Sequence, residues 1–357
     1  MAAPTGAAAD RAADPEQTAR DVQLAHLVHL STPTGLFEHA LGTEPRPEHG
    51  MCVDDVARAL VVTARVPSPD ETVTSLVGTY LRFVRGAQRG AAGLLHNRRT
   101  AGGRWWGVPT AGDHWGRALW SLGVAASHLP SGPLADDALR GADRALVARS
   151  PYPRSTAYAA LGAVEMLRVA PGHPDALGLL HEARATLPRP VADLRWPWPE
   201  PRLTYANSVL PEAMIATAEV LDDRALLADG LAMLRWLVAE QRVDGHLSVV
   251  PAGGRGPDDV RPGFDQQPIE VAALAEAAAT ARRVTGDPAW SAVVELCAAW
   301  FEGANDTGTV VRDAVTGGGF DGLERVGVNL NQGAESTLAW LSCAQLAAAR
   351  PGADAAA

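Results

Sequence analysis

The stretch FDQQPIEVAALAEAAATA (264–281) shows how this chain folds. It starts with polar residues and then becomes almost uniformly apolar and rich in alanine. Alanine favours a helix because it loses no side-chain entropy there. A helix that is apolar on all faces must be buried on all faces. The stretch therefore predicts an interior helix with a polar beginning.

Two classes of helical segment alternate along the chain. The interior class has five more members: VDDVARALVVTA (53–64), DHWGRALWSLGVAA (113–126), RSTAYAALGAVEML (154–167), YANSVLPEAMIATAEVL (205–221) and NQGAESTLAWLSCAQLAAA (331–349). The second class is more amphipathic: EQTARDVQLAHLVHL (16–30), ETVTSLVGTYLRFV (71–84), ADDALRGADRALVARS (135–150), PDALGLLHEARATL (174–187), DRALLADGLAMLRWLVAEQ (223–241) and PAWSAVVELCAAWFEG (288–303). One helical hairpin cannot cover its own apolar face, whereas a ring of hairpins can. We therefore expect an all-α fold, an (α/α)6 toroid of six helical hairpins in one domain at 16–349, between disordered tails at 1–15 and 350–357.

The connections that lead into the interior helices are long. Four of them cover 86–112, 187–204, 242–263 and 303–330, and alternating stretches such as GHLSVVP (245–251) predict small β-hairpins. Connections of this length in a compact domain are usually functional. They should gather on the rim where the interior helices begin.

Polar residues at these helix starts should converge on one central funnel. Helix N-termini carry unpaired N–H groups and a partial positive charge, which stabilise carboxylates. The predicted catalytic carboxylates are Asp54, Asp55, Asp265, Glu270 and Glu335. The predicted binding residues are Asp113, His114, Arg117, Arg154, Tyr205, Asn207, Glu212, Gln266, Gln267, Asn329, Asn331 and Gln332. Ordinary N-capping is the alternative for each of them.

Tryptophans and histidines on the rim extend this set. Trp105, Trp106 and Trp115 offer flat apolar faces on which sugars can stack, and His246 lies in one of the long connections. Trp120 lies within a helical segment and is expected in the core. Glycoside cleavage requires two carboxyl groups, one as acid and one as base or nucleophile. The pattern favours a carbohydrate site.

Charge and composition exclude several other classes. The net charge is −10 and no long basic run occurs, which argues against a nucleic-acid partner. No apolar run approaches the roughly 20 residues that span a bilayer. The N-terminal residues lack a secretory pattern and the three cysteines form no CxxC, so we expect a cytoplasmic protein. No motif for a metal or cofactor is found, and neither is expected.

Three segments resemble a known superfamily. VDDVARAL (53–60), FDQQPIEVAALAEA (264–277) and VNLNQGAESTLAWL (328–341), with the six-hairpin period, resemble the six-hairpin glycosidases. They are most similar to glycosidase-like proteins associated with bacterial glycosyltransferases. The resemblance covers about 16–348. It implies the toroid fold, a saccharide ligand and a glycosyltransferase partner.

The sequence thus leaves three functions open. The first is a glycoside hydrolase or phosphorylase that uses a carboxylic acid pair on an oligosaccharide. The second is a sugar epimerase with His114 and His246 as acid and base. The third is a non-catalytic saccharide-binding or glycosyltransferase-partner protein.

Overall fold

The computed structural model describes residues 15–89 and 91–349, which form twelve helices and several very short strands. Six inner helices are α2 (Val53–Ala64), α4 (Asp113–His128), α6 (Pro153–Val169), α8 (Val209–Leu221), α10 (Pro268–Thr285) and α12 (Ala334–Ala348). The outer helices are α1 (Pro15–Leu30), α3 (Glu71–Ala87), α5 (Pro133–Ala145), α7 (Pro174–Thr186), α9 (Arg224–Gln241) and α11 (Ala289–Phe301). The predicted tails lie outside the described residues, except for Pro15 at the start of α1.

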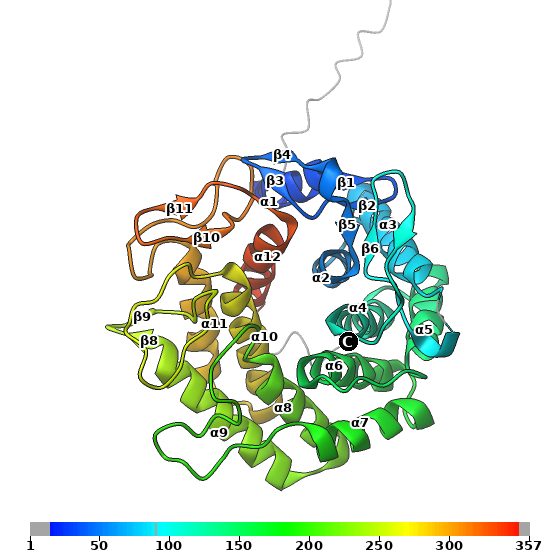
Figure 1. Ribbon diagram of the computed structural model, residues 1–357. Coiled ribbons are helices and arrows are strands. Elements are labelled where there is room, and N and C mark those ends of the chain that lie inside the picture. Colours follow the sequence, from blue (N-terminus) through cyan, green and yellow to red (C-terminus); the bar gives the residue numbers. More distant parts are fainter. Residues whose placement is uncertain (1–14, 90, 350–357) are drawn as a thin grey trace, which may run out of the picture.

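The inner helices form a closed ring (Figure 1). Each contacts the next in chain order, and α12 contacts α2. Helices α3, α5, α7, α9 and α11 each pack on the inner helix before them, while α1 packs on α12. The predicted (α/α)6 toroid is confirmed, and the contact of α12 with α2 supplies the closure that the sequence alone did not establish.

The long connections carry small antiparallel pairs of strands, as predicted. Between α1 and α2 lie β1 (Ser31–Thr32), β2 (Gly35–Leu36), β3 (Ala40–Leu41), β4 (Glu44–Pro45) and β5 (Met51–Cys52). The other strands are β6 (Arg98–Arg99), β7 (Trp105–Trp106), β8 (Arg242–Val243), β9 (His246–Leu247), β10 (Gly322–Leu323) and β11 (Val328–Asn329). Strands β5, β6 and β7 form one sheet, which leads directly into α2.

Three inner helices begin a few residues later than the polar residues suggested. Helix α8 begins at Val209, α10 at Pro268 and α12 at Ala334. Pro268 occupies the first turn of α10, where its missing N–H costs no hydrogen bond. The polar residues before these helices therefore belong to the ends of the connections.

Glycines allow α4 and α6 to pack closely. A Cβ on Gly123 would lie 2.3 Å from the carbonyl oxygen of Gly162, and one on Gly116 would lie 2.2 Å from that of Ser155. A larger residue would push the two backbones apart. This close approach brings side chains of the two helices into contact at the centre of the ring. Among the described helices, none is long and apolar enough to cross a membrane.

Candidate functional site

The inner helices begin without side-chain caps. None of α2, α4, α6, α8, α10 and α12 has an N-cap side chain that accepts a hydrogen bond from its first turn. Two outer helices, by contrast, are capped by Asp70 and Asp223. Simple capping therefore does not account for the polar residues at the inner helix starts. We call the band of charged and amide side chains at these starts the collar, and describe it in ring order below.

The first part of the collar joins α2 to α12 through one guanidinium. Arg58 donates to Asp55 Oδ1 at 2.5 Å and lies 2.7 Å from Glu335 Oε2. Cys52 Sγ donates to the other oxygen of Asp55 at 3.1 Å. Asp55 is buried, whereas the Glu335 side chain is 42% exposed. Asp55 thus holds Arg58, and Arg58 holds a carboxylate that faces solvent.

Burial governs the ionisation of Asp55. It raises the pKa of Asp55 to about 7, with Arg58 opposing the shift and the nearby carboxylates of Glu335 and Glu38 adding to it. Because both Asp55 oxygens accept hydrogen bonds, the ionised form is the one that holds Arg58. Asp55 is therefore an anchor whose charge changes near neutral pH.

The second part of the collar joins α2 to α4. Arg117 donates to Asp54 Oδ1 at 2.8 Å, and Asn97 Nδ2 donates to Oδ2 at 2.9 Å. The Arg117 guanidinium also lies 4.7 Å from the ring centroid of Tyr158 on α6. Burial acts to raise the pKa of Asp54, but Arg117 and Arg58 outweigh it, and the pKa is lowered. Asp54 is therefore a fixed negative charge.

Asp113 differs from the other collar carboxyl groups. It opens α4, is only partly buried, and its side chain makes no hydrogen bond within the described part of the chain. Burial raises its pKa, and Asp54 adds to this while Arg117 opposes it. A carboxyl group with a raised pKa, open to solvent and without a fixed partner, is suited to give a proton to a bound molecule.

The third part of the collar joins α6, α8 and α10. Arg154 donates to both oxygens of Glu200 at 2.7 and 2.8 Å and to Asn207 Oδ1 at 3.2 Å. Asn207 Nδ2 donates in turn to Glu270 Oε2 at 2.9 Å, and the amide of Ala206 donates to the other oxygen of Glu270. Burial raises the pKa of Glu270 to about 7, although these two donors lower it. Glu270, like Asp55, is occupied in holding its neighbours.

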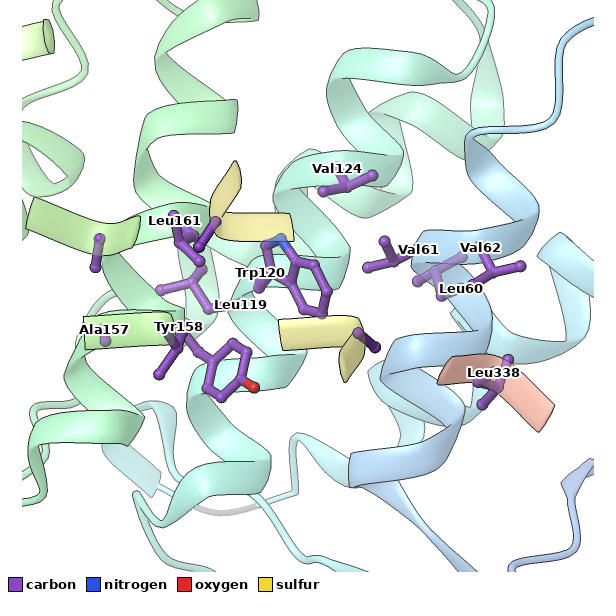
Figure 2. Packing of buried hydrophobic residues seen from close by; sticks show 14 of the residues in the cluster. Leu60, Val61, Val62, Leu119, Trp120, Val124, Ala157, Tyr158, Leu161 and Leu338 are labelled. Atoms are coloured by element: carbon purple, nitrogen blue, oxygen red, sulfur yellow. The ribbon is translucent and has the colours of Figure 1, made fainter. Parts of the chain in front are cut away.

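A cavity lies at the centre of the ring, where residues of all six inner helices line it, including Arg58 of the collar. Its volume is about 40 Å³, enough for a few waters at roughly 10–15 Å³ each. Trp120 and Tyr158 line it, with ring centroids 5.6 Å apart (Figure 2). Trp120 was expected in the core, and it does pack there, but it also faces this central space.

A second group of polar and charged side chains lies deeper along the inner helices than the collar, and we call it the girdle. Arg65, just after α2, bonds Glu276 in the middle of α10 at 2.7 Å, and Ser342 in the middle of α12 donates to the same Glu276 oxygen at 2.6 Å. Glu212, in the first turn of α8, accepts from Thr280 at 3.0 Å. Burial, with the charge of Glu276, raises the pKa of Glu212 to about 8. Glu212, predicted as a binding residue of the central funnel, lines the central cavity.

The rim aromatics divide into exposed and packed rings. Trp106 is 50% exposed and Tyr205 is 40% exposed. Trp105 packs on Phe83, with ring centroids 4.9 Å apart. Trp115 is fully buried, and its indole N–H donates to the carbonyl of Ala145 at 3.0 Å. The prediction that Trp115 contacts a ligand is wrong, because a tryptophan near a helix start can also face the outer layer.

Several other predicted binding residues hold connections together. Gln266 is fully buried and donates to Asp306, which His246 also contacts at 3.0 Å. Gln332 is buried and donates to Asp313 at 3.0 Å. The buried ring of His114 lies 3.0 Å from the carbonyl of Leu95. The structure does not bring His114 and His246 together, since each is engaged in its own connection.

The remaining predicted residues lie in the last residues before α10 and α12. Asp265 is exposed and Gln267 is half-buried. Asn329 accepts from the amide of Asn331 at 3.1 Å, and Asn331 accepts from the amide of Gly42 at 2.9 Å. These asparagines fasten the connection before α12 to the β3–β4 turn.

Sequence reasoning missed four members of the collar: Arg58, Glu38, Asn97 and Glu200. Arg58 lies within VDDVARAL, three residues after Asp55, a spacing that places both on one helix face. This spacing was the available signal. Glu38 and Asn97 come from connections that nothing in the sequence ties to α2.

One group of side chains has the composition of a metal site. Ligand atoms of Glu38, Cys52 and Asp55 lie within 4.8 Å of one another. Glu38 is already paired with Arg98 and Asp55 with Arg58. Burial strongly raises the pKa of the Cys52 thiol, whereas a metal ligand must be the thiolate. These residues therefore do not fit a metal as they stand.

Comparisons with known proteins agree on the fold. No protein-family model and no curated protein matches the chain. A sugar epimerase from a ruminal bacterium superposes with a TM-score of 0.69 at 11% identity, covering 92% of this chain and 98% of that one. Cellobiose 2-epimerase from Spirochaeta thermophila gives 0.59 at 13%, covering 93% and 96%. A glycosidase variant in complex with glucose gives 0.59 at 17%, covering 94% and 99%. The chain therefore has the six-hairpin (α/α)6 fold that these sugar-processing enzymes share.

Proposed function

We propose that this protein is a carbohydrate-active enzyme that cleaves a glycosidic bond with two collar carboxyl groups. One observation carries the proposal: Asp113 and Glu335 differ from the buried collar carboxyl groups, which are held by hydrogen-bond donors. Asp55 and Glu270 are each held by two donors. Asp113 and Glu335 are both accessible to solvent. Asp113 has a raised pKa, and Glu335 is ion-paired with Arg58.

The roles of the two groups follow from their surroundings. Asp113, with its raised pKa and free oxygens, protonates the leaving oxygen. Glu335, ion-paired with Arg58, acts as the base or nucleophile. Arg117, which donates to Asp54, opposes the pKa shift of Asp113. The sequence prediction for Glu335 is kept, while Asp54, Asp55 and Glu270 become positioning groups.

The fold comparison is consistent with a saccharide at this site. One superposed structure is a glycosidase with bound glucose. The cavity at the centre of the ring is lined by Trp120, Tyr158 and the collar residue Arg58, which supports a sugar bound where the collar meets this cavity. Water or phosphate then reaches the sugar from the open side, so hydrolysis and phosphorolysis are both compatible with the geometry.

Sugar epimerisation is the second candidate, because two of the three structures described above are epimerases. This chemistry needs an acid and a base close to one sugar carbon. His114 in α4 contacts the carbonyl of Leu95, whereas His246 contacts Asp306. These different partners count against the acid–base pair expected from the sequence. Similarity of fold to these structures is compatible with both activities.

The test is a product assay on a panel of oligosaccharides, with and without inorganic phosphate. We expect a reducing sugar or a sugar phosphate from the wild type, and no product from Asp113→Asn or Glu335→Gln with an unchanged helical circular dichroism spectrum. Conversion of a reducing sugar into its epimer would establish the second candidate. Binding without any product would favour the non-catalytic or glycosyltransferase-partner alternative.

A further inference from the structure

The exposed tryptophan and tyrosine side chains of the described residues all precede inner helices that are neighbours in the ring. Among the described residues, three aromatic rings are more than about a third exposed: Trp106, Tyr152 and Tyr205 at 50, 59 and 40%. Each stands just before an inner helix: Trp106 in the connection to α4, Tyr152 at the N-cap of α6, and Tyr205 in the turn before α8. Helices α4, α6 and α8 are consecutive in the ring.

Both tyrosines are adjacent to Arg154. Tyr152 precedes Arg154 by two residues, and the Arg154 guanidinium lies 5.3 Å from the Tyr205 ring centroid. Arg154 Nε also donates to the Tyr205 carbonyl at 2.6 Å. The same arginine bonds Asn207, which bonds Glu270. The Tyr205 ring is thus fixed directly to the collar, and Tyr152 stands at the N-cap of the helix that carries Arg154.

Trp106 is fixed to the collar from the other side. It pairs with Arg98 across β6 and β7, and Arg98 pairs with Cys52 across β5 and β6. Two strand spacings of about 4.8 Å place the Trp106 backbone roughly 10 Å from Cys52. Asn97, next to Arg98, bonds Asp54. The indole therefore stands beside the α2–α4 part of the collar.

We propose that Trp106, Tyr152 and Tyr205 form stacking platforms for an oligosaccharide whose reacting end lies at the collar. The proposal rests on the proposed function. An arc over three helix starts, with neighbouring axes about 8–10 Å apart, is roughly 20 Å long. One sugar ring covers only part of it, so the substrate is a chain of several sugars rather than a monosaccharide. Exposed flat rings in water gain by covering the C–H faces of sugars.

The kinds of exposed apolar residue differ between the two sides of the rim, and this difference supports a sugar chain that runs over α4, α6 and α8. On the α10–α12 side, the exposed apolar residues are aliphatic, such as Val260, Val326 and Leu330. Asp113 at the start of α4, whose carboxyl group makes no hydrogen bond within the described part of the chain, can accept from or donate to sugar hydroxyls. The chain of sugars therefore runs over α4, α6 and α8.

The experiment is calorimetry with oligosaccharides of glucose, mannose, xylose and N-acetylglucosamine, from one to six units long. It is done in the Glu335→Gln background so that the ligands stay intact. Affinity should rise with length, and Trp106→Ala and Tyr152→Ala should each weaken binding of the longest ligand roughly three- to tenfold. The monosaccharide should be affected less than twofold. Tyr152→Phe keeps the aromatic ring and should bind the longest ligand as tightly as the protein with Tyr152.

Val169→Ala is the matched control, because Val169 is exposed at the far end of α6. Affinity that does not depend on length, or platform variants that behave like this control, would overturn the arc. Length-dependent binding lost in the variants, with no cleavage by wild type, would support the arc and reject the proposed activity. Cleavage without length dependence would reject the arc alone. Binding of no sugar at all would reject both.

Discussion

The collar lies at the starts of the inner helices and the girdle lies deeper along them, and both contain buried carboxyl groups with raised pKa values. In the collar, Glu335 is 42% exposed and Asp113 has no hydrogen-bond partner among the described residues. In the girdle, Arg65 and Ser342 hold Glu276, and Thr280 holds Glu212. The chemistry of the residues is alike, but the girdle carboxyl groups are buried, with Glu212 5% and Glu276 8% exposed.

This difference shows that a raised pKa alone does not mark a functional site. Burial raises the pKa of Glu212 to about 8, higher than the value of about 7 for Asp55. Arg65 and Glu276 belong to α2 and α10, which are separated in the ring by α12, so their ion pair ties non-adjacent helices together. The girdle therefore has the character of a structural fastening, and the collar that of a binding surface.

The largest expected effect compares Glu335→Gln with Glu212→Gln. Both changes replace a carboxyl group by an isosteric amide, one in the collar and one in the girdle. We expect kcat to fall about 10²–10⁴-fold for Glu335→Gln, the usual range for losing an acid–base group. Steady-state kinetics on the best glycan should show less than a tenfold change for Glu212→Gln. Equal losses would mean that the girdle takes part in the chemistry.

Arg65→Ala should destabilise the fold by about 3 kcal/mol, because it leaves Glu276 buried without its charged partner. Urea unfolding followed by circular dichroism measures this. Asp258→Ala, which removes the exposed partner of Arg195, is the control and should change stability by less than about 0.5 kcal/mol. A similar small change for Arg65→Ala would show that the girdle does not fasten the ring.

The Glu212 carboxyl group should make the free energy of unfolding fall as pH rises. Its pKa is raised from 4.5 to about 8 on folding, so the folded state binds the proton more tightly. The free energy of unfolding therefore decreases between about pH 5 and 8. Glu212→Gln removes this contribution, and its stability should decline less steeply than that of wild type over the same range. Parallel slopes in urea titrations at several pH values would contradict the assignment.

Cys52→Ala should produce the smallest effect, on the acidic side of the pH–rate profile. The thiol donates to ionised Asp55 and lowers its pKa, so its loss should raise that pKa. We expect wild-type activity to fall below about pH 7, where Asp55 takes up a proton. In Cys52→Ala this pH limit should move up by roughly half a unit to one unit. Cys297→Ala, a buried cysteine on α11, should leave the profile unchanged. An unmoved profile in Cys52→Ala would mean that Asp55 does not anchor the site.

Local pattern predicted the architecture well because it is repeated along the chain. The segment 264–281 is apolar on all faces, and α10 is buried along most of its length. The alternation with amphipathic segments predicted which helices lie outside. The polar starts also predicted that Asp54, Asn207 and Glu270 belong to one site. Asp54 is bonded to Arg117, and Asn207 is bonded to both Arg154 and Glu270.

Individual roles were harder to predict because they depend on partners far apart in sequence. Trp115 and Trp106 lie nine residues apart in the same connection and helix start, yet one is fully buried and the other half-exposed. Which way a ring turns depends on α5, whose Ala145 accepts the Trp115 N–H. Glu212 and Glu270 both lie in the first turn of an inner helix, but only Glu270 meets the donors at the start of α8.

The amino-acid sequence by itself determined twelve helices, their inner or outer position and the rim that collects the polar residues, because hydrophobic periodicity acts through local spacing. The tertiary structure decided the closure of α12 on α2, the sharing of Arg58 between Asp55 and Glu335, and the openness of Asp113. Those features depend on which side chains meet across the ring, and burial and hydrogen bonding there set the charge of each carboxyl group.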